Sequence, residues 1–222
     1  RRAVERIRDK PLLGIVGPTG VGKSSFVRAG LVPALKTSGE DWQALIVRPG
    51  RDPLASLANL LAPLSSASAT LETIEAEHRV MRERIRAEPG YVGSLLRALA
   101  RRDNCHLLLF VDQFEELYTL VADKSDREAF VAALEGIADD ASSPLRVVLS
   151  MRSDFLDRVG ESESFLDALS QALIFLQAPT REGLQEALTL PLHTLGYQFE
   201  SPGLVSEMLD ALATTPGALP LL

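Results

Sequence analysis

The sequence predicts an α/β fold with a parallel five-stranded sheet between layers of helices, followed by a helical unit. Five short apolar runs lack strict alternation, which is typical of strands buried on both faces. Helical patterns separate the runs, as expected of parallel strands joined by crossovers. With 46% hydrophobic and 24% charged residues in a chain of 222, the composition is that of a globular protein with a sizeable core. The runs cover residues 12–16, 44–47, 107–111, 145–149 and 172–176.

Helix-start signals precede several of the helical segments. Each combines a small polar side chain that can cap a helix with a neighbouring proline or with an acid three residues later. The signals are Asp52 before Pro53, Ser125 with Glu128, Thr180 after Pro179, and Ser201 before Pro202.

The pattern changes near Pro179. Beyond residue 176 it is helical only, over 181–190 and 203–213. We therefore expect residues 1–178 to form the α/β domain and residues 179–222 to begin a smaller helical subdomain. The chain ends on an apolar segment without a polar cap, so we expect it to belong to a longer protein.

Charge and composition exclude several classes of function. Acidic residues outnumber basic ones by 30 to 23, which gives a net charge of −7, so nucleic acid is not expected as the main ligand. The single cysteine, Cys105, permits no internal disulfide and favours a reducing compartment. The longest charge-free stretch, 53–71, holds polar residues and prolines, so no membrane span is expected. The first ten residues lack a signal-peptide run, which favours a cytoplasmic location.

The strongest motif lies between the first predicted strand and a predicted helix, and it matches GxxxxGK[ST] in full. The glycines reach backbone angles that other residues avoid, so main-chain N–H groups can surround phosphates at the positive end of the following helix. In such a loop, Lys23 meets the β- and γ-phosphates and Ser24 coordinates Mg²⁺. The motif therefore predicts nucleotide binding; the alternative is a glycine-rich turn without a ligand. The candidate nucleotide-binding residues are Gly17, Pro18, Thr19, Gly20, Val21, Gly22, Lys23, Ser24 and Ser25.

A phosphoryl-transfer site also needs a carboxylate for the metal and often a second one for the attacking water. The run 107–111 leads into Asp112, as in a Walker B element, so Asp112 is the expected metal-side residue. The next residue, Gln113, cannot act as a base. Glu115 and Glu116 are the candidate catalytic acids, because a helix starting at Gln113 would turn both to one side. The alternative is an amphipathic helix start with solvated acids.

These residues resemble the STAND NTPases, signal-transducing relatives of the AAA+ ATPases that include the NACHT and NB-ARC groups, and especially the branch called novel STAND. Acids delayed after the Walker B aspartate are part of the resemblance. Residues 147–155 are similar to the family's sensor strand, which ends in an arginine near the γ-phosphate, and Arg152 stands at that position. The alternative is a surface arginine paired with Asp154 or Asp157.

A second segment, 216–221, is similar to the family's glycine–proline motif, whose proline contacts the adenine side of the nucleotide. One extra residue separates Gly217 from Pro220. Either Pro220 makes the adenine contact, or the segment is an ordinary helix-breaking turn.

The resemblance implies an AAA+-like P-loop NTPase fold with strand order 5-1-4-3-2, binding of ATP or ADP with Mg²⁺, and slow ATP hydrolysis. It implies a signalling switch in which ADP stabilises a resting state and ATP favours an assembled state, which can be a homo-oligomer. It further implies sensor and effector domains in the parent chain. Two alternatives stay open: a nucleotide-holding scaffold without turnover, and a P-loop phosphotransferase acting on a small molecule, for which the arginines of 79–86 are the only candidate lid.

The charged segment 72–88 alternates both signs, which is typical of a solvated helix or a partner surface. Stacking aromatic residues are not interleaved with its arginines, so it does not favour nucleic-acid binding. Three histidines, His78, His106 and His193, stand far apart and none has metal-ligand spacing, so a zinc site is not expected.

Overall fold

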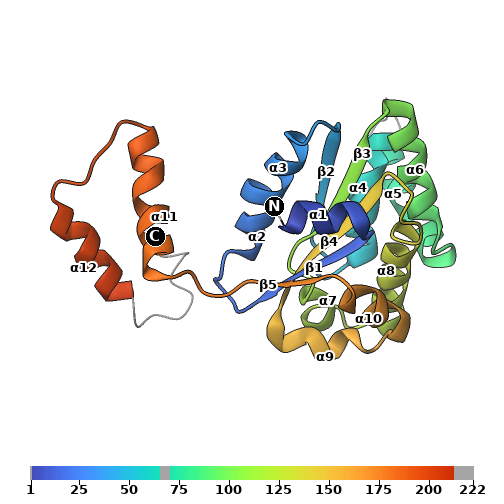
Figure 1. Cartoon of the computed structure of the whole chain (residues 1–222). Coiled ribbons are helices and arrows are strands. Elements are labelled where there is room, and N and C mark those ends of the chain that lie inside the picture. The colour runs from blue at the N-terminus through green and yellow to red at the C-terminus, as the bar shows by residue number, and fades with distance from the viewer. Residues whose placement is uncertain (1, 66–70, 213–222) are drawn as a thin grey trace.

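The computed structural model describes residues 2–65 and 71–212, and it places five parallel strands in one sheet in the order β2-β3-β4-β1-β5 (Figure 1). This order confirms the predicted parallel sheet and the strand order that the resemblance implied. The strands are β1 (Leu12–Gly17), β2 (Trp42–Val47), β3 (His106–Val111), β4 (Leu145–Arg152) and β5 (Leu173–Phe175).

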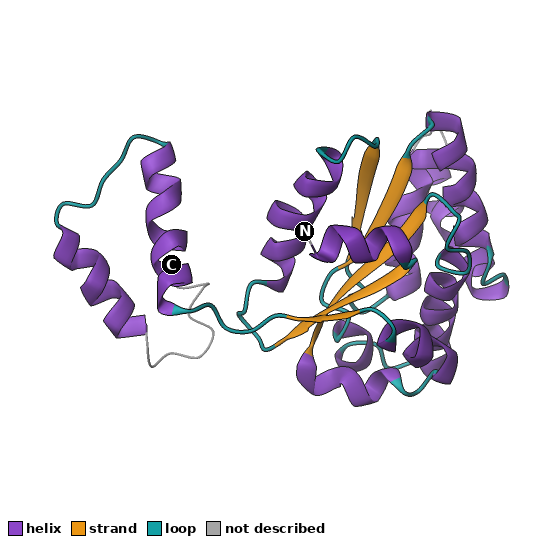
Figure 2. Cartoon of the chain, viewed as in Figure 1, coloured by secondary structure: helices purple, strands orange, loops and turns teal. Residues whose placement is uncertain are grey.

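Helices precede, separate and follow the strands (Figure 2). They are α1 (Arg2–Asp9), α2 (Lys23–Ser25), the π-helix η1 (Phe26–Leu31), α3 (Val32–Lys36), α4 (Pro53–Ser65), α5 (Leu71–Ala87), α6 (Tyr91–Asp103), α7 (Glu116–Thr119), α8 (Lys124–Ile137), the 3-10 turn η2 (Ser153–Phe155), α9 (Leu156–Val159), α10 (Glu163–Ser170), α11 (Arg181–Thr194) and α12 (Pro202–Leu212). None of the helices described is both long enough and apolar enough to cross a membrane.

The core lies on both faces of the sheet, and β3 shows why its apolar run has no alternation. Leu107, Leu109 and Val111 belong to the buried cluster that includes residues of α4, α6 and α8. Leu108 and Phe110 belong to the cluster on the other face, with residues of α1 and α3. Because successive side chains of a strand point to opposite faces, a strand covered on both sides needs an apolar residue at every position.

Three of the four predicted helix starts are confirmed, because their polar side chains accept a hydrogen bond from the first turn. The prediction for Ser125 was wrong: α8 begins at Lys124, and Asp123 caps it by accepting from Ser125 N at 2.8 Å. The backbone of Asp123 is extended, which suits an N-cap, whereas Ser125 already lies inside the helix. The confirmed pairs are Asp52 with Ala55 N at 3.0 Å, Thr180 with Gly183 N at 3.3 Å, and Ser201 with Leu204 N at 3.3 Å.

The last two described helices, α11 and α12, form a pair of their own at one side of the α/β body (Figure 1). Their contact is a small apolar cluster of Leu184, Leu188, Val205 and Leu209. The predicted boundary near Pro179 lies in the connection between β5 and α11. Because 213–222 lie outside the described residues, the division at 179 stays a prediction.

Candidate nucleotide-binding site

The carboxyl edge of the sheet brings most of the predicted site residues together. Gly17 at the end of β1 pairs in register with Arg152 at the end of β4. A cavity of about 800 Å³ opens at this edge, which is where open parallel sheets bind ligands. Pro220 lies outside the described residues, so its adenine contact stays a prediction. The cavity lining includes 19–25, Glu115, Glu116 and Arg152.

Glycines shape the phosphate loop for two different reasons. Gly20 and Gly22 have φ angles of 74° and 87°, in the left-handed region that favours glycine. Gly17 is needed for close packing instead, because a Cβ there would lie 2.6 Å from the carbonyl oxygen of Leu176. The expectation that the glycines are needed for unusual backbone angles is therefore wrong for Gly17.

The Lys23 ammonium folds back over the phosphate loop. Its Nζ donates hydrogen bonds to the carbonyl oxygens of Gly17 and Pro18, both at 2.9 Å. Burial lowers the pKa of Lys23, and the negative charge of Glu115 opposes that shift. A phosphate oxygen would offer this ammonium a charged acceptor, which makes a stronger hydrogen bond than a carbonyl does.

The fully buried carboxylate of Asp112 accepts four hydrogen bonds. Ser24 Oγ and Ser150 Oγ donate to its Oδ1 at 2.6 and 2.8 Å. The Nη2 atoms of Arg28 and Arg48 donate to its Oδ2 at 2.9 and 3.4 Å. Burial alone would raise the pKa of Asp112, but the hydrogen bonds and the positive charges outweigh it and hold the pKa below its ordinary value. Asp112 is therefore kept as a carboxylate.

Ser24 and Asp112 fit a magnesium ion by the chemistry of their donors. A hydroxyl and a carboxylate meet at 2.6 Å, and Mg²⁺ prefers such oxygen ligands, using one or two from the protein beside waters and phosphates. Across the described ranges, no group of three or more His, Cys, Asp or Glu side chains could hold a metal. An ion at Ser24 and Asp112 would therefore depend on the phosphates of a nucleotide.

The chain turns sharply after Asp112. Gln113 has a φ of 57°, and its N–H donates to Ser150 Oγ at 3.0 Å. The expectation that a helix starts at Gln113 was wrong, since α7 begins only at Glu116. The left-handed residue interrupts the helical path between Asp112 and the two acids, so the acids do not follow Asp112 on one continuous helix, although both line the cavity.

The two acids reach different partners at the cavity. Glu115 Oε2 accepts from the main-chain N of Arg152 at 3.4 Å, whereas Glu116 Oε2 accepts from Gly50 N at 3.1 Å. Burial raises the pKa of Glu115, and the positive charges of Lys23 and Arg152 offset part of that shift. Glu115 is thus coupled to the phosphate loop, and Glu116 is tied to the β2–α4 connection.

Arg152 lines the cavity but is paired with an acid. Its Nε and Nη2 donate to the two carboxylate oxygens of Asp154 at 3.0 and 2.6 Å. The guanidinium also lies over the ring of Phe155, 5.2 Å from its centroid. The pairing is the alternative that the sequence left open for Arg152, and it occurs at the rim of the site.

The model of the family described as novel STAND NTPase 1 matches residues 1–222, the whole chain. The chain belongs to this family. This STAND domain is therefore a P-loop NTPase domain, a class that binds nucleotides. No curated protein sequence gives a significant match to it.

Solved structures share the AAA+-like fold of the STAND domain at low sequence identity. The chain spans only about half the length of these proteins, and at such identity the likeness shows the fold alone. One is the ORC2 protein of Aeropyrum pernix in its ADP form, with 15% identity and a TM-score of 0.59 over 91% of this chain and 52% of that chain. Another is Cdc6p of Pyrobaculum aerophilum, with 15% identity and a TM-score of 0.60 over 99% of this chain and 58% of that chain. A third is AMPPCP-bound DnaA of Aquifex aeolicus, with 12% identity and a TM-score of 0.55 over 94% of this chain and 53% of that chain.

Sequence reasoning missed three residues that contact Asp112 in the STAND domain. Arg28 lies one helical turn after Ser24, and residues with this spacing share a side of a helix. Arg48 follows β2 directly at the carboxyl edge of the sheet, and Ser150 lies on β4 beside β3. These positions are signals that could have identified all three.

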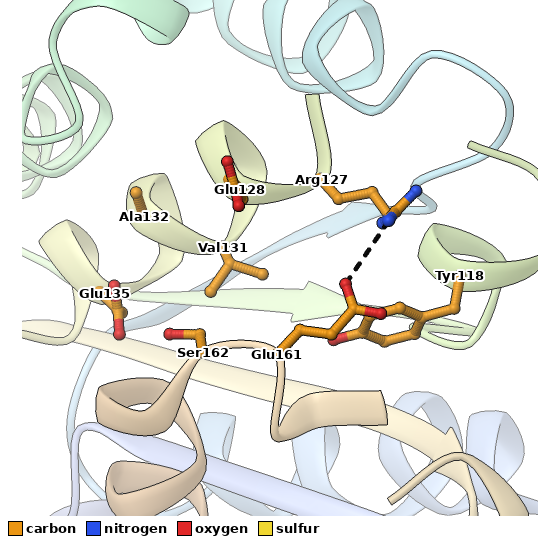
Figure 3. A pocket seen from close by; sticks show the side chains of 8 residues that line it. All are labelled: Tyr118, Arg127, Glu128, Val131, Ala132, Glu135, Glu161 and Ser162. Atoms are coloured by element: carbon orange, nitrogen blue, oxygen red, sulfur yellow. Dashed lines mark ion pairs between the residues drawn. The ribbon is translucent and has the colours of Figure 1, made fainter. Parts of the chain in front are cut away.

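A second cavity, of about 280 Å³, lies between α7, α8 and the α9–α10 connection (Figure 3). Arg127 in its wall forms an ion pair with Glu161 at 3.5 Å and donates to the Val121 carbonyl at 3.1 Å. Among the described residues, none that lines this cavity also lines the first one. This second cavity is therefore separate from the cavity at the phosphate loop.

Three of the four arginines in the candidate lid segment 79–86 contact neighbouring segments: the residue that caps α4, a residue of α8 and a residue of α6. None of these three lines the cavity at the phosphate loop. The contacts are Arg82 with Asp52 at 2.9 Å, Arg86 with Asp126, and Arg84 over the Tyr91 ring at 4.3 Å from its centroid.

Proposed function

We propose that this STAND domain binds ATP with Mg²⁺, hydrolyses it slowly, and serves as a nucleotide-dependent switch in a longer protein. The observation that carries the proposal is the convergence of Lys23, Asp112 and Glu115 at one edge of the sheet, where the charges of both acids act on Lys23. Phosphoryl transfer needs these three groups: a cation for the phosphates, a carboxylate for the metal and an acid for the water.

The phosphate loop and four side chains divide the chemistry. The main-chain N–H groups of 17–25 and the Lys23 ammonium bind the phosphates. Ser24 and Asp112 hold Mg²⁺, which when bound neutralises phosphate charge. Glu115 orients the attacking water and accepts its proton as the new oxygen–phosphorus bond forms and the bond to the β–γ bridging oxygen breaks, releasing ADP and phosphate. Its raised pKa makes Glu115 a stronger base than an ordinary glutamate.

Arg152 is the proposed sensor of the third phosphate. Its ion pair with Asp154 holds the guanidinium at the cavity rim, where a γ-phosphate can replace the carboxylate. A contact made with ATP and not with ADP is the differential interaction that a switch requires. In this proposal, residues 179–222 begin a lid over the nucleotide, and Pro220 contacts the adenine. The parent chain carries sensor and effector domains, and the ATP-bound state assembles into a homo-oligomer.

The second candidate is an interaction scaffold that holds nucleotide without turning it over. Gln113 stands where many ATPases of this class have their catalytic acid, and two arginines occupy the metal-side carboxylate. Single-turnover hydrolysis separates the candidates: release of phosphate from stoichiometric ATP supports the switch, and bound ATP that persists supports the scaffold.

ATP affinity measured by titration tests the site itself. Replacing Lys23 by alanine removes the ammonium from the loop, and we expect ATP affinity to fall at least about tenfold, the order of loss for one charge-assisted contact. Lys36→Ala is the matched control, because Lys36 is an exposed lysine at the end of α3. An equal ATP affinity for the Lys23 variant and the wild type would overturn the assignment.

A further inference from the structure

The carboxylate of Asp112 is saturated with donors inside the described structure. A carboxylate offers about four lone-pair positions. Two hydroxyl groups occupy those of Oδ1, from Ser24 at 2.6 Å and Ser150 at 2.8 Å. Two guanidinium groups occupy those of Oδ2, from Arg28 at 2.9 Å and Arg48 at 3.4 Å.

This saturation conflicts with metal binding at the same carboxylate. A magnesium ion beside Ser24, or a water bound to it, needs an oxygen of Asp112 as a partner. The ion would also stand close to two positive charges that already neutralise the buried carboxylate. For Mg²⁺ to bind, either a serine hydroxyl must release Oδ1 or an arginine guanidinium must release Oδ2 of Asp112.

The arginines are the groups that can leave. Their side chains are 44% and 51% exposed, so a released guanidinium regains water, and both have long, rotatable stems. Ser150 is 1% exposed and is held in β4, where its Oγ also accepts from Gln113 N. Moving Ser150 would disrupt the turn that carries the acids, whereas moving Arg28 or Arg48 disturbs only a half-exposed side chain.

We propose that Arg28 and Arg48 compete with Mg²⁺ for Asp112, so that metal binds only when at least one of them releases Oδ2. The proposal rests on the proposed nucleotide site and adds its regulation: the two arginines set how much metal the site needs. Arg48 also belongs to the β2–α4 connection, which Gly50 ties to Glu116. Release of Arg48 therefore loosens the same connection that holds the second acid.

Metal affinity is measured directly with Mn²⁺ as the probe, by electron paramagnetic resonance of the free ion, with and without saturating ADP. Arg28→Gln and the double variant with Arg48→Gln remove the competing charges. We expect the half-saturating Mn²⁺ concentration to fall about tenfold in Arg28→Gln and further in the double variant, the order expected for removing a positive charge beside a divalent ion. Arg28→Lys, which keeps the charge, should stay near the wild-type value.

Arg51→Gln is the matched control, because Arg51 is exposed in the same connection and is not a partner of Asp112 among the residues described. An equal shift in Arg51→Gln and Arg28→Gln would show only a general charge effect and overturn the competition. Unchanged or weaker Mn²⁺ binding in the double variant, with a native circular dichroism spectrum, would also overturn it. Failure of the wild type to bind ADP would instead refute the proposed function, whereas an unchanged Mn²⁺ affinity in variants that do bind ADP would refute the competition alone.

Discussion

Both oxygens of the Asp154 carboxylate bind the guanidinium of Arg152, at 3.0 Å from Nε and 2.6 Å from Nη2. Arg152 also lines the cavity behind the phosphate loop. Because both side chains are substantially exposed, solvent screens their attraction, and the ion pair contributes little stability despite its two hydrogen bonds. A phosphate group carries more negative charge than one carboxylate, so it can take the arginine from Asp154.

The first prediction concerns discrimination between ATP and ADP. Asp154→Asn frees Arg152, and we expect ATP affinity to rise a few-fold while ADP affinity stays unchanged. Arg152→Ala removes the contact, so the ATP-to-ADP affinity ratio should fall about tenfold, the loss expected for one charge-assisted hydrogen bond. Titration with both nucleotides measures the ratio. Asp157→Asn, an exposed acid in α9, is the control, and a rise in ADP affinity equal to that for ATP would contradict the prediction.

The second prediction separates the two acids. Glu115→Gln should lower single-turnover ATP hydrolysis by about 10²- to 10⁴-fold, the range for loss of general base catalysis, while ATP affinity is retained. Glu116→Gln should lower it much less, because Glu116 accepts from Gly50 N at 3.1 Å and acts on the β2–α4 connection. Phosphate release from bound ATP is the measurement. Equal hydrolysis by the two variants would refute the assignment.

The third prediction is a pH dependence set by Glu115. Burial raises its pKa above the ordinary glutamate value of 4.5, and the base form is the carboxylate. The hydrolysis rate should therefore increase with pH through an apparent pKa above 4.5 and level off once Glu115 is ionised. Rates at constant ionic strength, with ATP saturating at every pH, give the profile. A midpoint at or below 4.5 would exclude Glu115 as the group that titrates.

Much of the fold could be predicted because the central strands β1, β3 and β4 are buried on both faces. The run 107–111 is apolar at every position, since β3 meets one cluster with Leu109 and the other with Phe110. The phosphate loop was predictable because its glycines and its lysine occur at fixed spacings within one short segment, 17–24. A constraint between residues that are close in the sequence can be recognised from the sequence alone.

The contacts of Asp112 could not be predicted with the same certainty, because they join four separate segments. Arg28, Arg48 and Ser150 are distant from Asp112 in the sequence and become neighbours only when β1, β2, β3 and β4 are in register. The turn at Gln113 was missed for a related reason. Its left-handed backbone depends on the hydrogen bond from its N–H to Ser150 Oγ on the adjacent strand, and no local spacing reveals that bond.

The fourth prediction concerns Arg146, a buried arginine at the other end of β4. It is 7% exposed, and its guanidinium donates hydrogen bonds to main-chain carbonyls at the end of α1, in the turn before β4 and at the first residue of β4. Helix carboxyl ends carry unpaired carbonyls and partial negative charge, so the guanidinium serves as a cap that joins α1 to the sheet. The acceptors are Ile7 O at 2.5 Å, Arg8 O at 3.0 Å, Ala141 O at 3.1 Å, Ser143 O at 2.6 Å and Leu145 O at 2.7 Å.

Arg146→Met keeps much of the buried volume but leaves these carbonyls without their donor. We expect the free energy of unfolding to fall by about 3 kcal/mol, the cost of stranding buried partners of a charged group. Urea denaturation measures the loss, with Arg158→Met, an exposed arginine in α9, as the control. Because Arg146 lies near the start of β4 and Arg152 ends the strand at the site, the folded variant should bind ATP with unchanged affinity. Equal stability of the two variants would show that α1 does not depend on this cap.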